Sequence, residues 1–516
     1  MWDPPAEVRH AIVLRARAFD AAGNAVGKTI TNSYFITDLM ERQPQLPAVS
    51  IAIDYGELYD ADSGLFSPNG WDSCNSFGTG NFNQRGREWE RLANVEFYEL
   101  DNNGFAQELG IRVHGGKTRQ YMQKPLKLYA RSEYGNKKIH YPLFEECQYD
   151  KFKRLVLRPF SSGLWRAGIQ DLLAQRICRP LKFISLASRP VTLYINGEYW
   201  GIYYLQEAPD ERLIEELYDV DEEEVNIVGS WFQLENGSDT GFTQMREWLK
   251  DADLSDSLQY SYFSGIFDID DFIDYVLFES FAANQDWPTN NIRSYQYGNA
   301  PWRWIFFDGD ETFIDIERNM PYYLTYEGED TWPSWIEATL FFRKLIESPV
   351  FIGHFYDRLV ELTNSTFSYH NTAPYLEQIK ELLDDEVPWQ SERFNIPRDY
   401  DEWRYAMYHI DQFLRKRPEW FYHQMTTFVR KPVETERQYL LYPNPAKGYV
   451  CIQGSDVEDR ITTCYIYSSS GSLVATYPLY FTDEPTVCQI PVTSLAPGIY
   501  LLSIPDIDTS FHFIVY

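Results

Sequence analysis

The apolar residues of this chain repeat with a different period in each region, and that order limits the folds open to it. Up to about residue 210, short alternating runs separated by turn residues predict β-strands, with helical patterns only at 167–178 and 210–219. From about residue 270, apolar residues recur every three or four positions, which predicts helices. The chain therefore predicts an α+β fold, with a strand-rich lobe followed by a helix-rich lobe.

Changes in composition divide the chain into four expected parts. Residues 1–40 hold two alternating runs around the turn AAGNAVG and predict the end of a β-sandwich that begins upstream. Residues 46–430 form the central domain, 431–440 a polar linker, and 441–516 a small β-sandwich of short strands. The first residues lack the basic start and apolar core of a signal peptide, so we interpret the chain as a fragment without its true N-terminus.

The balance of charges excludes some classes of partner. The chain has 46 Lys and Arg against 76 Asp and Glu, a net charge of −30. This argues against broad binding of nucleic acids or anionic membranes, although a local basic pocket remains compatible with it. No apolar run reaches the length of a membrane span.

The six cysteines give little sign of a metal site. None lies in a C-x-x-C pair, so a structural zinc site is not expected. Three of them, Cys451, Cys464 and Cys488, lie close to the C-terminus, where one disulfide is possible.

Oxygen ligands cluster at the ends of two strongly apolar segments. Asp286 follows the helix-like run FIDYVLFESFAA, and Asn291 comes five residues later. Asp308 and Asp310 directly follow the strand-like run WRWIFF. An Asp with an Asn five residues on, and a second Asp at a strand end, is the spacing that protein kinases use for a base and metal ligands. The alternative is structural: Asp286 and Asn290 cap a helix, and 308–311 form an acidic turn.

A cation for phosphates is available in GIRVHGGKTRQYMQKPLKLYAR. Gly115 and Gly116 predict an amide-rich turn between strands, and Lys124 follows where its ammonium could reach a phosphate. Glu207, at the end of the strand WGIYYLQE, could hold Lys124 in an ion pair. The alternatives are a plain hairpin turn for the glycines and capping of the helix DERLIEEL for Glu207.

Residues from about 46 to 430 resemble the spore-coat protein H (CotH) kinase family, which consists of atypical secreted protein kinases. The stretches that carry the resemblance occur in the family's order: GIRVHGGKTRQYMQKPLKLYARSEYG, RLVLRPFSSGLWRAGIQDLLAQRI, RPVTLYINGEYWGIYYLQE, NQDWPTNN, WRWIFFDGDETF and FLRKRPEWF. The resemblance implies a kinase-like fold that uses ATP with Mg²⁺ or Mn²⁺ to phosphorylate Ser or Thr.

The resemblance also assigns roles to individual residues. It implies that Lys124 contacts the ATP phosphates, that Asp286 is the catalytic base, and that Asn291 and Asp308 hold metal. Asp310, the second acid of the family's D-x-D motif, is a further candidate ligand. The chain departs from the family at Gly309 and Glu311, where an apolar residue and Trp are usual. These departures bear on the metal geometry and therefore on activity.

Two further resemblances concern the ends of the chain. The stretches LYPNPAKGYVCIQ, YIYSSSGSLV and LAPGIYLLSI resemble the type A C-terminal sorting domain of type IX secretion in Bacteroidetes. This implies export to the bacterial surface or beyond, with the secretion machinery as a partner. ARAFDAAGNAVG resembles part of the C-terminal β-domain of chitobiase-type enzymes.

We therefore expect a secreted kinase that transfers the ATP γ-phosphoryl group to Ser or Thr of extracellular or surface proteins. Because ATP is scarce outside cells, a second hypothesis is a kinase-like surface protein without catalysis that binds glycans or proteins. A third hypothesis is a carbohydrate hydrolase in which Asp308 and Asp310 form the carboxylate pair.

Overall fold

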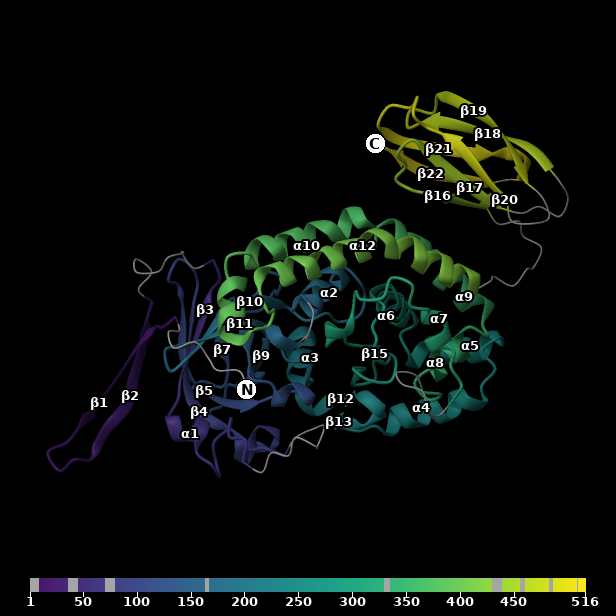
Figure 1. The fold of residues 1–516 in the computed structure, drawn as a ribbon. Helices are drawn as coiled ribbons and strands as arrows, with labels where there is room; N and C mark the ends of the chain where they lie inside the picture. The colour runs from purple at the N-terminus through teal and green to yellow at the C-terminus, as the bar shows by residue number, and fades with distance from the viewer. Residues whose placement is uncertain are drawn as a thin grey trace. The chain divides into compact units, whose positions relative to one another are not determined.

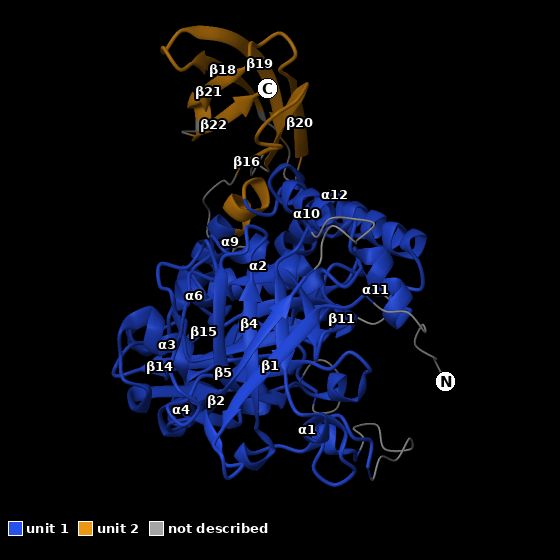
Figure 2. Ribbon diagram, turned by 90° about the vertical axis from the view of Figure 1, so that its left-hand side faces the viewer, with its two compact units in different colours: residues 1–358, 366–428 blue, residues 359–365, 429–516 orange. Residues whose placement is uncertain are grey.

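The computed structural model describes residues 9–35, 45–69, 79–162, 167–328, 335–428, 439–454, 460–481, 486–507 and 509–516. The chain divides into two compact units (Figures 1 and 2). The first unit comprises residues 1–358 and 366–428, and the second comprises 359–365 and 429–516. Most of the expected linker at 431–440 lies outside the described residues.

A closed seven-stranded barrel forms the strand-rich part of the first unit. Its neighbours pair in the order β10, β11, β9, β6, β5, β4 and β3, and only the β3–β10 pair is parallel. The strands are β3 Ala48–Ala52, β4 Arg91–Tyr98, β5 Gly104–Val113, β6 Leu126–Tyr129, β9 Arg154–Pro159, β10 Ser188–Ile195 and β11 Glu198–Glu207. Closure pairs every strand on both sides, so the barrel leaves no open edge.

The barrel has an apolar inside and a polar outside because side chains alternate along each strand. Leu126 and Leu128 on β6, with Leu155 and Leu157 on β9, belong to the buried core cluster. The residues that alternate with these leucines point outward, and they include three cations that matter below: Lys127, Arg154 and Arg158. Two very short strands, β7 Ile139–His140 and β8 Lys151–Phe152, pair beside the barrel.

Helices and a second sheet make up the rest of the first unit (Figure 1). The sheet has the order β13, β12, β14 and β15, with bounds Leu234–Asn236, Val225–Val228, Ser294–Tyr297 and Arg303–Trp304. The helices are α1 Tyr55–Tyr59, α2 Gln170–Cys178, α3 Glu211–Tyr218, α4 Thr240–Asp251, α5 Ser257–Ile266, α6 Ile269–Ala282, α7 Met320–Leu324, α8 Leu340–Leu345, α9 Pro349–Asn364, α10 Tyr369–Leu383, α11 Val387–Phe394 and α12 Tyr400–Phe428. Strands therefore dominate up to β11, and helices dominate from α4 onward, as the periodicities predict.

Helix α6 is buried apart from Asp270 near its start, and most of the side chains that it buries are apolar. Its buried acids have partners: Asp271 accepts from the Trp304 N–H, and Asp274 accepts from Arg358. Asp268 begins the helix by accepting a hydrogen bond from the Asp271 N–H at 3.1 Å. The helix ends at Ala283, which has left-handed backbone angles. A buried helix of this kind is a fixed support for the loop that follows it.

Near the N-terminus, β1 Ile12–Phe19 and β2 Ala25–Tyr34 form an antiparallel hairpin. Most of its side chains are exposed, but the Ser33 hydroxyl is buried and donates to Glu96 of β4 at 2.6 Å. Within the described residues 9–35 only this pair of strands is present, so the β-sandwich module expected at 1–40 stays a prediction.

The second unit consists of two antiparallel sheets whose buried side chains form one cluster. One sheet has the order β16, β17 and β20 (Tyr439–Tyr442, Tyr449–Gly454, Thr486–Pro491). The other has the order β19, β18, β21 and β22 (Leu473–Phe481, Arg460–Ser468, Gly498–Ile504, Thr509–Val515). Cys451, Cys464 and Cys488 are free thiols here, so the disulfide that the sequence allows is not formed among them. None of the described helices is long and apolar enough to cross a membrane.

A buried ion pair joins the segment before β1 to the start of helix α11. Arg9 Nη1 lies 3.0 Å from Glu386 Oε1, and the Tyr199 hydroxyl of β11 donates to the same oxygen at 2.7 Å. Both charged side chains are less than a tenth exposed. Loss of one partner would therefore leave a buried charge poorly compensated.

We expect Arg9→Met to lower the free energy of unfolding of the first unit by about 3 kcal/mol, because Glu386 stays buried without its cation. Urea unfolding followed by tryptophan fluorescence measures this unit alone, since all 15 tryptophans precede residue 429. The double variant R9M/E386Q should recover most of the loss. Equal destabilisation of the single and double variants would contradict the ion-pair explanation. Arg398→Met, at an exposed pair, is the control and should leave the free energy of unfolding nearly unchanged.

Candidate functional site

The loop after α6 holds Asp286 and Asn291 against each other. Asn284 is fully buried and donates from Nδ2 to Glu279 Oε2 at 2.9 Å, while its Oδ1 accepts from the Asp286 N–H at 3.1 Å. Asn291 Nδ2 then donates to Asp286 Oδ2 at 3.1 Å. Residues 284–293 form turns without a helix, so the alternative in which Asp286 and Asn290 cap a helix is wrong.

The acidic turn at 308–311 is bonded to that loop through the backbone. The Gln285 N–H donates to Glu311 O at 3.0 Å, and the Phe313 N–H donates to Ala282 O at 2.9 Å. Asp308 has left-handed angles (φ 61°, ψ 56°), after which residues 309–311 form a 3₁₀ turn. The structure thus places side by side the two oxygen-rich segments that the sequence separates by about twenty residues.

An arginine on the barrel neutralises the acidic turn. Arg158 Nη2 donates to Asp308 Oδ1 at 2.8 Å and to Asp310 Oδ2 at 2.6 Å. Arg158 comes from the outward face of β9, four residues after Arg154. The sequence gives one signal for Arg158, because a cation stands at an alternate position of the apolar strand RLVLRP. It does not indicate that Asp308 and Asp310 are the partners of this cation.

Asp171 of α2 fastens the acidic turn to the barrel. Its Oδ1 accepts from the Gly309 N–H at 2.8 Å, and its Oδ2 accepts from Gln206 Nε2 of β11 at 2.8 Å. The approach is close: a Cβ on Gly309 would lie 2.9 Å from the Phe306 ring and 3.1 Å from the Ala174 side chain. A glycine therefore stands at 309 because helix α2 packs directly against the turn.

The electrostatics of the site favour a cation among the acids. Burial raises the pKa of Asp310 to about 8, and Asp308, Asp171 and Glu311 add to the rise while Arg158 opposes it. Beside the Gly115–Gly116 turn, burial and four cations hold the pKa of His114 well below its ordinary value; these cations are Lys127, Arg119, Arg158 and Arg293. An acidic turn therefore faces a cationic barrel wall.

The donor atoms suit a hard divalent metal. Asp286, Asn291, Asp308 and Asp310 offer oxygen ligands of the kind that Mg²⁺ and Mn²⁺ prefer. Across the described parts of the chain, no three His, Cys, Asp or Glu side chains are already gathered for a metal ion. Arg158 holds two of the carboxylates, so the donors fit a metal only if Arg158 gives up at least part of its contact with them.

Comparison with protein families fits this geometry. The family model described as CotH kinase protein matches residues 111–421, well over half of the chain. The chain belongs to the CotH kinase protein family. The model of the secretion system C-terminal sorting domain matches residues 440–513, which indicates bacterial secretion by the type IX machinery with attachment at the cell surface. No curated protein matches the chain. The chitobiase-like resemblance of residues 1–40 is outside both matches and stays a prediction.

The expected pairing of Lys124 with Glu207 is wrong. Lys124 Nζ donates to Arg119 O and Tyr121 O, each at 3.0 Å, and lies 4.1 Å from the centre of the Phe82 ring. Glu207 instead accepts from the Ala187 N–H at 2.8 Å and from the Tyr149 hydroxyl. The alternative role for Glu207, capping of helix α3, is also wrong. Asp210 caps α3 and accepts a hydrogen bond from the Arg212 N–H.

Strand alternation explains why Lys124 and Glu207 do not contact the Asp286 loop or the acidic turn. Lys124 is two residues before Leu126, and Glu207 is two residues after Leu205, so both share the inward side of the barrel with core residues. Burial lowers the pKa of Lys124 to about 7 and raises that of Glu207 to about 7. Contact of Lys124 with ATP stays untested and requires the ammonium to leave this position.

The glycine turn lies in the connection between β5 and β6, which pair as antiparallel neighbours, so the hairpin alternative holds for the strands on either side of it. Gly115 has φ 90°, and a Cβ there would lie 2.7 Å from Thr118 Oγ1. A short 3₁₀ helix, η4 Lys117–Gln120, follows before β6. The turn borders the cationic wall, which leaves phosphate binding by Gly115 and Gly116 as a prediction.

A second arginine, Arg417 of α12, holds the backbone on which the Asp286 loop and the acidic turn are built. It is fully buried, and it donates only to carbonyl groups in the contacts that the structure gives. Two acceptors, Ser280 O at 2.6 Å and Phe281 O at 3.1 Å, end helix α6. Two others, Ile316 O at 2.7 Å and Arg318 O at 3.2 Å, follow the acidic turn. Arg417 therefore joins both oxygen-rich segments to one helix.

We expect Arg417→Met to lower the unfolding free energy by about 3 kcal/mol, because buried carbonyls lose charge-assisted donors. Hydrogen exchange should accelerate first in residues 280–286 and 313–318. Arg415→Met is a matched control on the same helix, since Arg415 pairs with Asp411 at the surface. Uniform acceleration across the first unit would contradict a local bracing role.

The buried Lys124 should give stability a measurable pH dependence. Its folded pKa of about 7 lies below the ordinary 10.5, so between these values the unfolded chain binds more protons and stability rises with pH. Relative to Lys124→Met, the wild type should therefore gain about 2 kcal/mol between pH 7 and pH 9. Urea unfolding at each pH measures this difference. Exposed Lys416→Met is the control, and a flat difference for Lys124→Met would refute the burial effect.

Proposed function

We propose that the chain is a secreted, metal-dependent protein kinase that transfers the ATP γ-phosphoryl group to Ser or Thr of surface or extracellular proteins. The observation that carries the proposal is the meeting of the Asp286–Asn291 pair with the Asp308–Asp310 turn in a member of the CotH family. Phosphoryl transfer depends mainly on positioned oxygen ligands, a base and cations, and this site contains all three kinds of group.

Each residue has a definite task in this proposal. Asp286 accepts the proton of the acceptor hydroxyl, and Asn291 orients the Asp286 carboxylate through the bond at 3.1 Å. Asn291, Asp308 and Asp310 would hold Mg²⁺ or Mn²⁺. A metal bound there would neutralise charge on the phosphate oxygens. Arg158 turns from the carboxylates to the phosphates, for which a planar guanidinium is well suited.

One observation favours the second hypothesis, a kinase-like surface protein without catalysis. Arg158 already binds two of the three carboxylates of the acidic turn, those of Asp308 and Asp310. If this contact persists with nucleotide present, the metal ligands remain occupied and the fold serves only for binding. The hydrolase hypothesis is less compatible with the geometry, because Asp308 and Asp310 bind the same guanidinium nitrogen and do not flank an open gap.

Two conservative substitutions should separate the proposed roles. Asp286→Asn should lower kcat by about 10²- to 10⁴-fold and leave Mn²⁺-dependent ATP binding intact, because only the base is lost. Asp308→Asn should abolish Mn²⁺-dependent ATP binding. Transfer of label from γ-labelled ATP to a general acceptor measures activity, and calorimetry measures binding.

Asp62→Asn, in an exposed turn remote from the acidic turn in sequence, is the control and should match the wild type. Metal-dependent ATP binding without transfer in the wild type would refute the kinase and favour the binding protein. Transfer that survives in Asp286→Asn would refute the assigned base.

A further inference from the structure

Basic side chains line a cavity of about 320 Å³ on the outside of the barrel. Only two of the residues around it are acidic, Glu133 and Glu222, on a chain whose net charge is −30. The basic residues that line it, here called the basic pocket, are Arg87, Arg131, Lys137, Lys153, Arg154 and Arg212.

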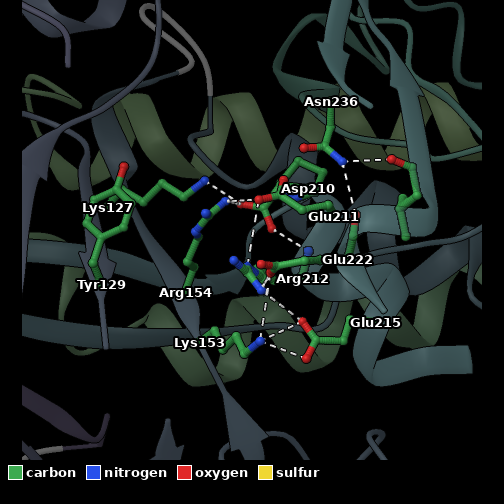
Figure 3. A network of polar contacts seen from close by, with 12 residues as sticks. Lys127, Tyr129, Lys153, Arg154, Asp210, Glu211, Arg212, Glu215, Glu222 and Asn236 are labelled. Atoms are coloured by element: carbon green, nitrogen blue, oxygen red, sulfur yellow. Dashed lines mark hydrogen bonds and ion pairs between the residues drawn. The ribbon is translucent and has the colours of Figure 1, made fainter. Parts of the chain in front are cut away.

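Carboxylates beside the basic pocket hold several of its cations in fixed positions (Figure 3). Arg154 lies 2.9 Å from Asp210, and Lys153 lies 2.7 Å from Glu215. Arg131 binds Glu90 through two nitrogens, at 2.7 and 2.8 Å, and the Glu90 side chain is completely buried. Cations held in this way lose little freedom when a ligand arrives.

Other cations of the basic pocket remain available to a ligand. Lys137 is exposed and has no ion pair among the described residues. Arg87 is paired only with Glu133, and the side chains are 64% and 45% exposed. Arg212, by contrast, is already held by the carboxylates of Glu215 and Glu222, so the cations open to a ligand are Lys137 and Arg87.

The basic pocket lies on the same strand face as the candidate catalytic site. Arg154 and Arg158 share the outward face of β9 and are four residues apart, which is about 13 Å along a strand. An extended polypeptide covers this distance in about four residues. The nucleotide has other cations to bind, since Arg158 and Arg119 stand beside the acidic turn and the glycine turn.

We propose that the basic pocket binds acidic side chains of the acceptor polypeptide, about four or more residues from the phosphorylated Ser or Thr. The proposal rests on the proposed function. The volume of the cavity favours this ligand, because it accommodates a few side chains. The net charge of −30 on the chain repels an extended polyanion such as a nucleic acid.

The test compares two labelled peptides by fluorescence anisotropy with the full chain. Each peptide contains one Ser with a block of three residues on either side, four residues away from the Ser. The blocks are Glu-Glu-Glu in one peptide and Gln-Gln-Gln in the other. The Glu peptide should bind about tenfold more tightly, and added salt should reduce the difference.

Charge reversal locates the site of binding. The variant R87E/K137E should lose the preference for Glu. The variant R404E/K416E changes the overall charge equally, at two exposed positions of helix α12, and should keep the preference. Both variants should retain Mn²⁺-dependent ATP affinity. With the acidic peptide as acceptor, R87E/K137E should raise KM about tenfold and leave kcat unchanged.

Equal binding of the two peptides would overturn the proposal, and so would an equal loss of preference in R87E/K137E and R404E/K416E. Loss of ATP affinity in R87E/K137E would also overturn it, because the pocket would then belong to the nucleotide. Phosphoryl transfer without peptide preference would refute the basic pocket alone. Peptide preference without phosphoryl transfer would uphold the basic pocket as an acidic-peptide site and refute the kinase alone.

Discussion

The contact of Arg158 with Asp308 and Asp310 is the interaction on which the site depends. Two carboxylates two residues apart in a partly buried turn repel each other, and burial penalises both charges. The guanidinium offsets this cost, and Asp171 adds a third carboxylate on its other side at 3.6 Å. The barrel, helix α2 and the acidic turn therefore converge on one cation. Any metal ion has to compete with it for the same oxygens.

The helix-rich part of the first unit fixes the positions of the oxygen ligands. Helix α6 is buried apart from Asp270, and the loop that carries Asp286 begins where the helix ends. Two backbone hydrogen bonds then join that loop to the acidic turn, and Arg417 holds the carbonyl groups on both sides. In the proposed kinase, preorganisation of this kind would lower the cost of binding a metal and a nucleotide.

The two units of this acidic secreted protein serve different tasks, and the clustered cations lie in the first unit. The strongly negative chain gathers one group of cations around His114 and another in the basic pocket, on the outside of the barrel. The matched sorting domain directs the whole chain to the cell surface, and it forms a compact unit with its own core. Export and the chemistry of the first unit thus depend on different parts of the chain.

The sequence by itself determined the features that are local. Periodicity indicated the strands and helices, the D-x-x-x-x-N and D-G-D segments marked the oxygen ligands, and the motifs identified the CotH family and the sorting domain. Only the tertiary structure decided which cation meets those ligands. Lys124 follows the glycine turn and resembles a phosphate ligand, but its place in the strand alternation turns it inward, while Arg158 on β9 faces the acids. Arg417 and Asp171 were equally hidden, because Ser280 at the end of α6 and Gly309 in the acidic turn, which they respectively bind, lie more than a hundred residues away in sequence and only packing brings them together.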